Sequence, residues 1–314
     1  MKQRNPFPYS DDNKRYLTWN YYLKQRYHKK VYKVPLNAGF TCPNRDGNAG
    51  TGGCTFCSSL GSGDYAGDVR DDLYKQFHEG KQMMERKWPN GLAIAYFQAF
   101  SNTYAPLQQL KEIYEPFRHN DEIISVAIAT RSDCLTVEIM DYLAEYNKDK
   151  ELWIELGLQS IHNQTADVIN RGHSFENFKE AVDELRKRNI NVVVHLMNSL
   201  PNETKEMMIE SARVVGQLDI QAIKIHMLHV TKQTIMGYQY SKQPFPLQSK
   251  EEYIDTIASQ LEVLPPTVII QRLTGDAPKD ALIAPLWTLK KTIVLNDIDK
   301  KMVERNTYQG RLYQ

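Results

Sequence analysis

Short apolar runs recur along the chain at intervals that suit alternating strands and helices. Parallel strands that are buried on both faces typically have nearly continuous apolar runs of this kind. Six runs are candidate strands: VYKVPLNAGF from Val31, LAIAYFQAF from Leu92, EIISVAIAT from Glu122, ELWIELGLQS from Glu151, NVVVHLMNS from Asn191 and QAIKIHMLHV from Gln221. The pattern therefore predicts about six strands of one parallel sheet.

The stretches between these runs have the spacing of amphipathic helices. Ser174 is a suitable N-cap for one helix, and a second follows the fifth apolar run. Their apolar positions are Phe175, Phe178, Val182 and Leu185 in the first helix and Met208, Ala212 and Val215 in the second. A repeated strand and helix predict an α/β fold, a partial (β/α)6 TIM-like barrel, in which chemistry gathers at the C-terminal ends of the strands.

The length of 314 residues suits one catalytic domain. No internal repeat, low-complexity tract or long linker marks a boundary within it. We expect an N-terminal basic and aromatic extension over residues 1–30, the core barrel over residues 31–280 and a C-terminal extension over residues 281–314.

The charges of the chain nearly cancel, with 39 Lys and Arg against 38 Asp and Glu. Any surface that binds nucleic acid must therefore be local. No run approaches the roughly 18 apolar residues of a membrane span, and the first residues lack the apolar stretch of a signal peptide. We therefore expect a cytoplasmic protein without a membrane partner.

Three of the four cysteines, Cys42, Cys54 and Cys57, lie in a glycine-rich loop after the first predicted strand. Their C-x11-C-x2-C spacing allows three thiolates to converge on one metal centre. A [4Fe-4S] cluster normally takes four cysteines, so three ligands leave one iron open for a ligand. The alternative is a zinc site completed by His28 or His78. The fourth cysteine, Cys134, is expected to be a packed small side chain.

The cysteine loop, AGFTCPNRDG to TGGCTFC, resembles that of the radical S-adenosylmethionine (SAM) superfamily, and most closely its YtqA/YhcC-type (MnmL-like) branch. The stretch from Glu155 to Pro201 resembles the radical SAM domain of the Elongator catalytic subunit, which modifies the wobble uridine of tRNA. The resemblance spans roughly residues 15–280. It implies a [4Fe-4S] cluster on the three cysteines and reductive cleavage of SAM to a 5'-deoxyadenosyl radical. It also implies an external one-electron reductant such as flavodoxin or ferredoxin.

The same resemblance implies a set of SAM contacts. They are Gln98, Ser101, Thr130, Arg131, Glu155, Gln159 and Arg171. An arginine fork suits the carboxylate of SAM, and an acidic or amide side chain suits its ribose hydroxyls. Without the resemblance, Arg171 would equally suit a surface salt bridge.

Polar residues near the ends of the later strands are candidates for the substrate side of the site. The predicted catalytic candidates are His229, Arg272 and Asp276, and further residues expected to face the pocket are His195, Asn198 and His226. The RLTGDAP turn is placed to cover the barrel mouth. The alternatives are hydrogen-bonded core histidines and an ordinary turn.

Residues 15–33 interleave basic and aromatic side chains, a combination that can bind phosphates and stack on unpaired bases. The alternative is an amphipathic helix that closes the barrel with a solvated basic face. The Elongator resemblance implies tRNA as a partner, and 314 residues leave no room for an acetyltransferase domain. We therefore expect conversion of a carboxymethylaminomethyl group on wobble uridine to an aminomethyl group. The alternatives are a radical SAM enzyme for a small metabolite or peptide, and a non-catalytic zinc-binding RNA adaptor.

Overall fold

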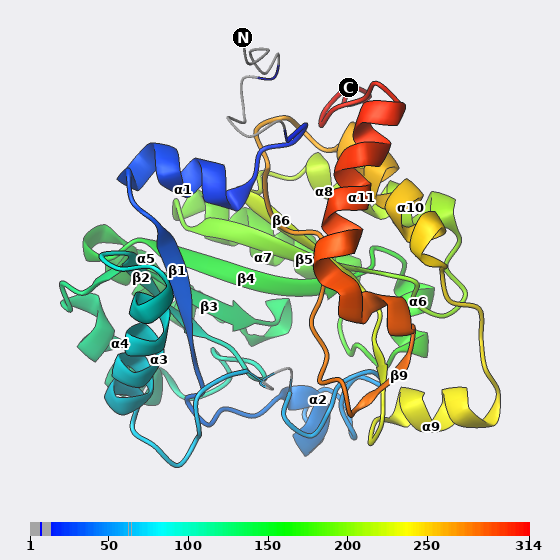
Figure 1. Cartoon of the computed structure of the whole chain (residues 1–314). Helices are drawn as coiled ribbons and strands as arrows, with labels where there is room; N and C mark the ends of the chain where they lie inside the picture. Colours follow the sequence, from blue (N-terminus) through cyan, green and yellow to red (C-terminus); the bar gives the residue numbers. More distant parts are fainter. Residues whose placement is uncertain (1–6, 8–13, 62, 64) are drawn as a thin grey trace, which may run out of the picture.

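The centre of the molecule is a curled sheet of seven parallel strands in the order β1-β2-β3-β4-β5-β6-β8 (Figure 1). The computed structural model describes residues 7, 14–61, 63 and 65–314. The strands are β1 (Val31–Leu36), β2 (Leu92–Phe97), β3 (Ile123–Thr130), β4 (Leu152–Gln159), β5 (Asn191–Asn198), β6 (Ala222–Met227) and β8 (Ile269–Arg272). All six predicted strands are confirmed, and the four-residue β8 adds a seventh.

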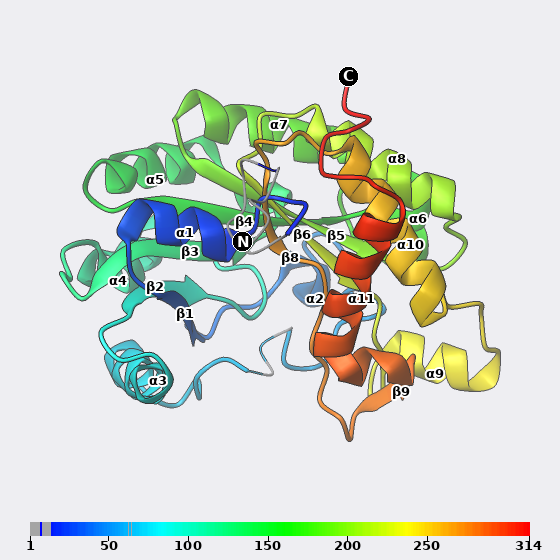
Figure 2. The same ribbon diagram turned by 45° about the horizontal axis from the view of Figure 1, so that its top comes forward.

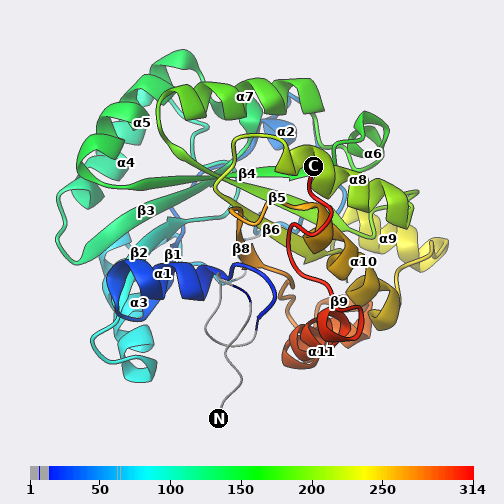
Figure 3. The same cartoon turned by 90° about the horizontal axis from the view of Figure 1, so that it is seen from above.

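Helices cover the outer side of this sheet, with α4, α5, α7 and α8 around its convex face (Figure 3). The helices are α1 (Trp19–Tyr27), α2 (Pro43–Asp46), α3 (Leu73–Lys87), α4 (Leu107–Arg118), α5 (Val137–Asp149), α6 (Asn163–Val168), α7 (Phe175–Lys187), α8 (Lys205–Gly216), α9 (Ile235–Lys242), α10 (Lys250–Val263) and α11 (Lys291–Glu304). Two 3-10 turns, Ser132–Cys134 and Leu286–Lys290, and a small antiparallel pair, β7 (Val230–Thr231) with β9 (Leu282–Ala284), complete the fold. The predicted TIM-like partial barrel is thus confirmed.

Both helices predicted from apolar spacing are present as α7 and α8. The Ser174 side chain caps α7 by accepting a hydrogen bond from the backbone N–H of Asn177 at 3.2 Å. Such a cap satisfies a backbone donor that the helix itself leaves unpaired. The start of α7 is therefore determined locally.

Side chains alternate between the two faces of each strand, as β4 illustrates. Leu152, Ile154 and Leu156 belong to the large apolar core beneath the helices, whereas Glu155 and Gly157 line a cavity inside the barrel. Because side chains of a strand point alternately to opposite faces, every second residue enters the barrel. The barrel interior therefore receives polar residues even from strands that are mostly apolar.

Helix α1 closes the N-terminal end of the barrel, opposite the cysteine loop (Figure 1). The ring of Trp19 meets that of Trp153 edge to face at 4.9 Å between centroids, and Tyr22 meets the same ring at 6.1 Å. Leu23 is buried in an apolar layer at the strand starts together with Trp153 and Val193. These aromatic rings pack inward. The structure therefore favours the helix that closes the barrel over a surface for stacking on RNA bases.

The last helices lie side by side at the β8 edge of the sheet, where α11 packs on α10 (Figure 2). The Gln309 side chain accepts from the Leu17 N–H at 2.8 Å and donates to the carbonyls of Pro265 and Val268. The chain beyond α11 is thereby tied to the segment before α1. The domain boundaries at residues 30 and 280 stay predictions, and residues 1–6 and 8–13 of the first extension lie outside the described residues.

Among the helices that the structure describes, none is both long and apolar enough to cross a membrane.

Candidate active site

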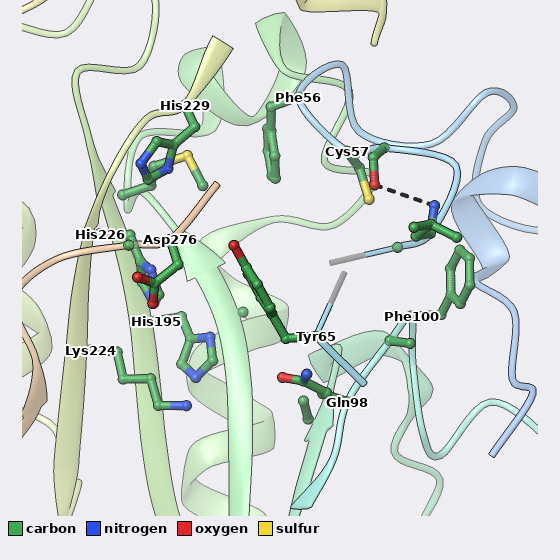
Figure 4. Close-up of a pocket in the computed structure, with 18 of the residues that line it drawn as sticks. Phe56, Cys57, Tyr65, Gln98, Phe100, His195, Lys224, His226, His229 and Asp276 are labelled. Carbon is green, nitrogen blue, oxygen red and sulfur yellow. Dashed lines mark hydrogen bonds between the residues drawn. The ribbon is translucent and has the colours of Figure 1, made fainter. Parts of the chain in front are cut away.

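A cavity of about 830 Å³ occupies the barrel and opens at the C-terminal ends of the strands. Its walls come from the cysteine loop, from inward positions of the strands and from the turn after β8. Figure 4 shows Tyr65 reaching into this space, with Cys57 and Phe56 on the side of the cysteine loop. The three loop cysteines all line the cavity.

The cysteine loop is held in a tight conformation around its thiols. The Cys57 N–H donates to the Cys54 carbonyl at 2.9 Å, and Gly53 has a φ of 79°, which favours glycine. A Cβ atom at Gly53 would lie 3.0 Å from Nε of Arg45. The turn therefore needs glycine to bring Cys54 and Cys57 to the same wall.

The three thiols are free, and polar groups surround them. Nδ2 of Asn44 lies 3.7 Å from Sγ of Cys54, and Nη1 of Arg171 lies 3.9 Å from the same sulfur. Burial, with a smaller contribution from Cys54, raises the pKa of the Cys57 thiol. A bound cation would reverse this effect, because metal coordination deprotonates a thiol.

The arrangement fits an iron-sulfur cluster better than a zinc ion. Thiolates around one zinc ion lie within about 4 Å of one another, whereas each thiolate of a [4Fe-4S] cluster binds a different iron. Among the described residues, no three Cys, His, Asp or Glu side chains are grouped closely enough for a single ion. His28 and His78 do not line the cavity. Nε of Arg171 is buried without a hydrogen-bond partner in the described part of the chain, so a donor beside Cys54 is available to a ligand.

All seven predicted SAM contacts line the cavity. Several of them already have protein partners. Arg131 forms a fork with Asp133, with nitrogen to oxygen distances of 2.8 and 2.6 Å, and Thr130 bonds Thr103 at 2.6 Å between hydroxyls. Arg171 donates to the Gly157 carbonyl, but its Nε has no hydrogen-bond partner among the described residues. The contact of each residue with SAM stays a prediction, and Arg171 is the candidate with the most evident spare donor.

Glu155 lies deeper than the other predicted contacts, four residues before the end of β4 and roughly 13 Å below it at about 3.3 Å per residue. Its carboxylate accepts from Nζ of both Lys33 and Lys224, and Nε2 of His195 lies 3.0 Å from Oε2. Burial acts to raise the pKa of this carboxyl, but Lys224 and Lys33 outweigh it, and the net pKa lies well below the usual value. In the structure its partners are therefore lysines.

The sequence analysis did not assign Lys224, Tyr96 or Gln271 to the site, and it treated Lys33 only as part of the basic stretch. All four line the cavity at the level of Glu155 or next to it. A signal was present, because Lys33 in VYKVPL and Lys224 in QAIKIHM are cations inside apolar strands. Such residues are rarely buried unless they are paired.

The predicted substrate-side residues also reach the cavity. His229, Arg272 and Asp276 line it, and burial lowers the pKa of His229 to about 4. Asp276 accepts from Nζ of Lys291 at 2.8 Å and lies 3.7 Å from the Arg272 guanidinium. The turn after β8 thus presents charged groups at the barrel mouth. Catalytic roles for these three residues stay predictions.

The remaining histidines and Asn198 separate into two groups. His195 and His226 line the cavity with ring centroids 5.7 Å apart. Asn198 does not line it, because its amide exchanges two hydrogen bonds with Gln260 at 2.8 and 2.9 Å. Cys134 is buried outside the cavity, and burial raises the pKa of its thiol to about 12. Asn198 and Cys134 are therefore packing residues.

Comparison with known proteins assigns the family. The model of the radical SAM superfamily matches residues 44–215, and that of the radical SAM C-terminal domain matches residues 220–304. The chain is 49% identical over 314 residues to the protein YtqA of Bacillus subtilis, with 100% of this chain and 98% of that protein covered. It is 24% identical over 180 residues to a tRNA uridine(34) acetyltransferase of Methanocaldococcus infernus, with 56% of this chain and 33% of that protein covered.

The fold agrees with a solved structure. The archaeal Elp3 of Methanocaldococcus infernus with an N-terminal deletion superimposes with a TM-score of 0.68 at 17% identity, with 90% of this chain and 64% of that chain covered. This chain therefore spans less than two thirds of that structure, and the likeness supports the barrel. Members of the matching family use a [4Fe-4S] cluster and SAM, which are accordingly the cofactors here. With three loop cysteines facing one barrel cavity and a family model over more than half of its length, the chain belongs to the radical SAM superfamily.

Proposed function

We propose that this radical SAM enzyme modifies the wobble uridine of tRNA in the cytoplasm, converting a C5 carboxymethylaminomethyl group to an aminomethyl group. The observation that carries the proposal is the cavity itself. Cys42, Cys54 and Cys57 stand at its open end, and α1 closes the other end. A base with its side chain would enter from the cysteine side, beside the cofactors.

When bound, the cluster and SAM would supply a 5'-deoxyadenosyl radical that takes a hydrogen atom from the carboxymethyl CH2 of the substrate, after an external reductant such as flavodoxin or ferredoxin delivers one electron. Loss of one electron from the substrate radical to the oxidised cluster would give an imine, and hydrolysis of the imine would release the two carboxymethyl carbons as glyoxylate and leave the aminomethyl group. The three cysteines would hold the cluster. Arg171, with its unpaired Nε beside Cys54, would bind the carboxylate of SAM, and Gln159 would bind its ribose. His229, Arg272 and Asp276 would orient the substrate at the mouth.

The proposal of tRNA as substrate rests on similarity and on access. The matched part of the Methanocaldococcus infernus protein belongs to an enzyme named for uridine 34 of tRNA. The cavity of about 830 Å³ lies within the size range of ligand pockets, so that a flipped base would fit. A small metabolite or a peptide could occupy the same cavity. The experiment below distinguishes these substrates from tRNA.

The first test is formation of 5'-deoxyadenosine under anaerobic conditions. The reconstituted protein would receive dithionite, SAM and an anticodon stem-loop with carboxymethylaminomethyluridine, and mass spectrometry would follow both nucleosides. We expect stem-loop-dependent 5'-deoxyadenosine together with aminomethyluridine. Cys57→Ala should lower both products at least 100-fold, because the cluster loses one of three ligands.

Cys134→Ala is the matched control, because Cys134 is a buried cysteine outside the cavity, and it should retain iron and activity. Wild-type protein that forms 5'-deoxyadenosine without any effect of tRNA would contradict the tRNA substrate. Protein that binds zinc and forms none would contradict the radical reaction.

A further inference from the structure

We infer that Lys33 and Lys224 form a subsite for a carboxylate of the substrate. Both lysines pair with Glu155 at the closed end of the cavity, which we call its floor. The inference rests on the proposed function and specifies which end of the substrate enters the barrel first. It assigns to the two lysines a binding role at the end of the cavity opposite the cysteines.

The floor is an assembled polar layer inside the barrel. Lys33 on β1 and Lys224 on β6 both donate to the Glu155 carboxylate on β4. Their Nζ atoms lie 4.7 and 4.8 Å from the centre of the Tyr96 ring. Below this layer, Trp153 and its neighbours are apolar and α1 closes the barrel. The lysines are therefore the deepest charged groups that a ligand entering from the mouth can meet.

The charge of the layer is not balanced by the protein. Two lysines share one carboxylate, so the layer has an excess positive charge when Lys224, whose pKa burial lowers to about 7, is protonated. Burial keeps the neighbouring histidines neutral: the pKa of His195 is lowered to about 4, and that of His226 lies well below its usual value. The nearest further cation, Arg272, pairs only at 3.7 Å with Asp276. An excess positive charge in a buried site is costly. A ligand with one negative charge would neutralise it.

Two polar nitrogens at the floor are also without a partner among the described residues. Gln271 accepts from Nζ of Lys33 through its Oε1 at 3.0 Å, but its Nε2 is buried without a partner among the described residues. Nε2 of His226 is likewise buried without one, and both residues line the cavity. A carboxylate has two oxygens that accept such bonds. Unpaired buried groups of this kind are typical of a site that is completed by a ligand.

The depth of the floor favours a carboxylate at the tip of a side chain over a phosphate of the RNA backbone. The carboxymethylaminomethyl group ends in a carboxylate, so this group would reach the lysines once the base itself has entered the barrel. The aminomethyl product lacks the carboxylate and loses this contact. The subsite would therefore distinguish substrate from product and would assist product release.

Binding measured separately from turnover tests the inference. Isothermal titration of the reconstituted, SAM-bound protein would compare the nucleoside 5-carboxymethylaminomethyluridine with its carboxamide, which lacks the negative charge of the carboxylate. We expect the wild type to bind the carboxylate at least tenfold more tightly. Lys224→Met and Lys33→Met should each reduce that preference below threefold, and Lys224→Arg should retain most of it because the cation remains.

Lys148→Met is the matched control, because Lys148 lies on α5 with 67% of its side chain exposed, and it should leave the preference unchanged. Circular dichroism and iron content would establish that each variant is folded and loaded. Equal binding of the two nucleosides by wild type, or an unchanged preference in both floor variants, would overturn the inference. If the preference is present but no stem-loop is converted, the subsite stands and the proposed function falls. If carboxylate and carboxamide stem-loops are converted equally, the proposed function stands and the carboxylate subsite is ruled out.

Discussion

Glu155 is the buried carboxylate on which the ion pairs of the barrel interior depend. It is fully buried, and both lysines of the floor donate to it. Removal of one partner from a buried ion pair costs more than the pair contributes, because the charge left behind stays in a medium of low dielectric constant. The floor therefore persists only while the carboxylate is present.

Glu155→Gln should lower the free energy of unfolding by about 3–5 kcal/mol, because two buried ammonium groups lose their shared acceptor charge. Urea denaturation of the cofactor-free protein, followed by circular dichroism, measures the effect. Glu145→Gln is the control, since its pair with Lys148 is exposed and should contribute less than about 1 kcal/mol. A Glu155→Gln protein as stable as wild type would show that the ion pairs are not needed for folding.

The affinity for a carboxylate ligand should depend on pH through Lys224. Burial, opposed by Glu155 and assisted by Lys33, lowers the pKa of this ammonium group to about 7. Lys224 therefore loses its positive charge as pH rises through 7, and binding of the carboxylate nucleoside should weaken about fivefold between pH 7 and pH 8, because the protonated fraction falls from about one half to about one eleventh. The groups that face it are Glu155, Lys33, Arg272, Tyr96, His195 and His226.

Titration calorimetry at pH 6, 7, 8 and 9 measures this dependence. The Lys224→Arg protein should show a flat profile over the same range, because arginine stays protonated. An identical decline in both proteins would assign the dependence to another group.

At the scale of single elements, α1 contributes most of the closure of the barrel. Its aromatic side chains meet Trp153 at the start of β4, and the helix contacts the edge strand β1. Thr18, which caps the helix, forms a bridge with Ile270 in β8 at the other edge. The helix thus connects strands from both edges of the sheet. Its basic residues Lys24 and Arg26 are exposed. The mixed basic and aromatic sequence follows from a helix with one face on the barrel and one face in water.

Trp19→Ala should lower the free energy of unfolding by about 2–4 kcal/mol, through loss of ring contacts and the cavity that remains. Gln25→Ala, at an exposed position of the same helix, should change it by less than about 0.5 kcal/mol. Thermal and urea unfolding measure both variants. We also expect folded Trp19→Ala protein to bind the anticodon stem-loop as wild type does. A large loss of affinity without a loss of stability would instead support stacking on RNA.

At the scale of the whole molecule, the barrel is closed and apolar at one end and open, polar and rich in histidine at the other. Burial lowers the pKa of His195 and His229 to about 4 and that of His173 to about 3. The unfolded chain, in which these imidazoles titrate near 6.5, binds more protons than the folded chain between pH 6.5 and pH 4. Stability is therefore lost as pH falls through that window.

The free energy of unfolding should accordingly fall by at least about 1.4 kcal/mol per pH unit between pH 6 and pH 5. Urea titrations of the cofactor-free protein at half-unit intervals measure the slope. His229→Gln should reduce it, whereas His78→Gln, which replaces a histidine with 57% side-chain exposure, should not. A slope that is the same for all three proteins would show that His229 titrates alike in the folded and unfolded chains.

Local patterns in the sequence determined much of this molecule. Six strands follow from apolar runs, α7 from its Ser174 cap, and the cysteine wall from the spacing of Cys42, Cys54 and Cys57. In each case neighbours in the chain carry the information, since strand runs, caps and tight turns are local. The short β8 escaped prediction because four residues do not establish a period.

Only the tertiary structure decided which charged residues meet. Lys33 and Glu155 are separated by 122 positions, and Lys224 and Glu155 by 69. Alternation along each strand shows that all three face inward, but their common height depends on the stagger between strands, which the closure of the barrel sets. The sequence therefore determined the strands and the cysteine wall, while the floor of the cavity arose from the curvature of the sheet.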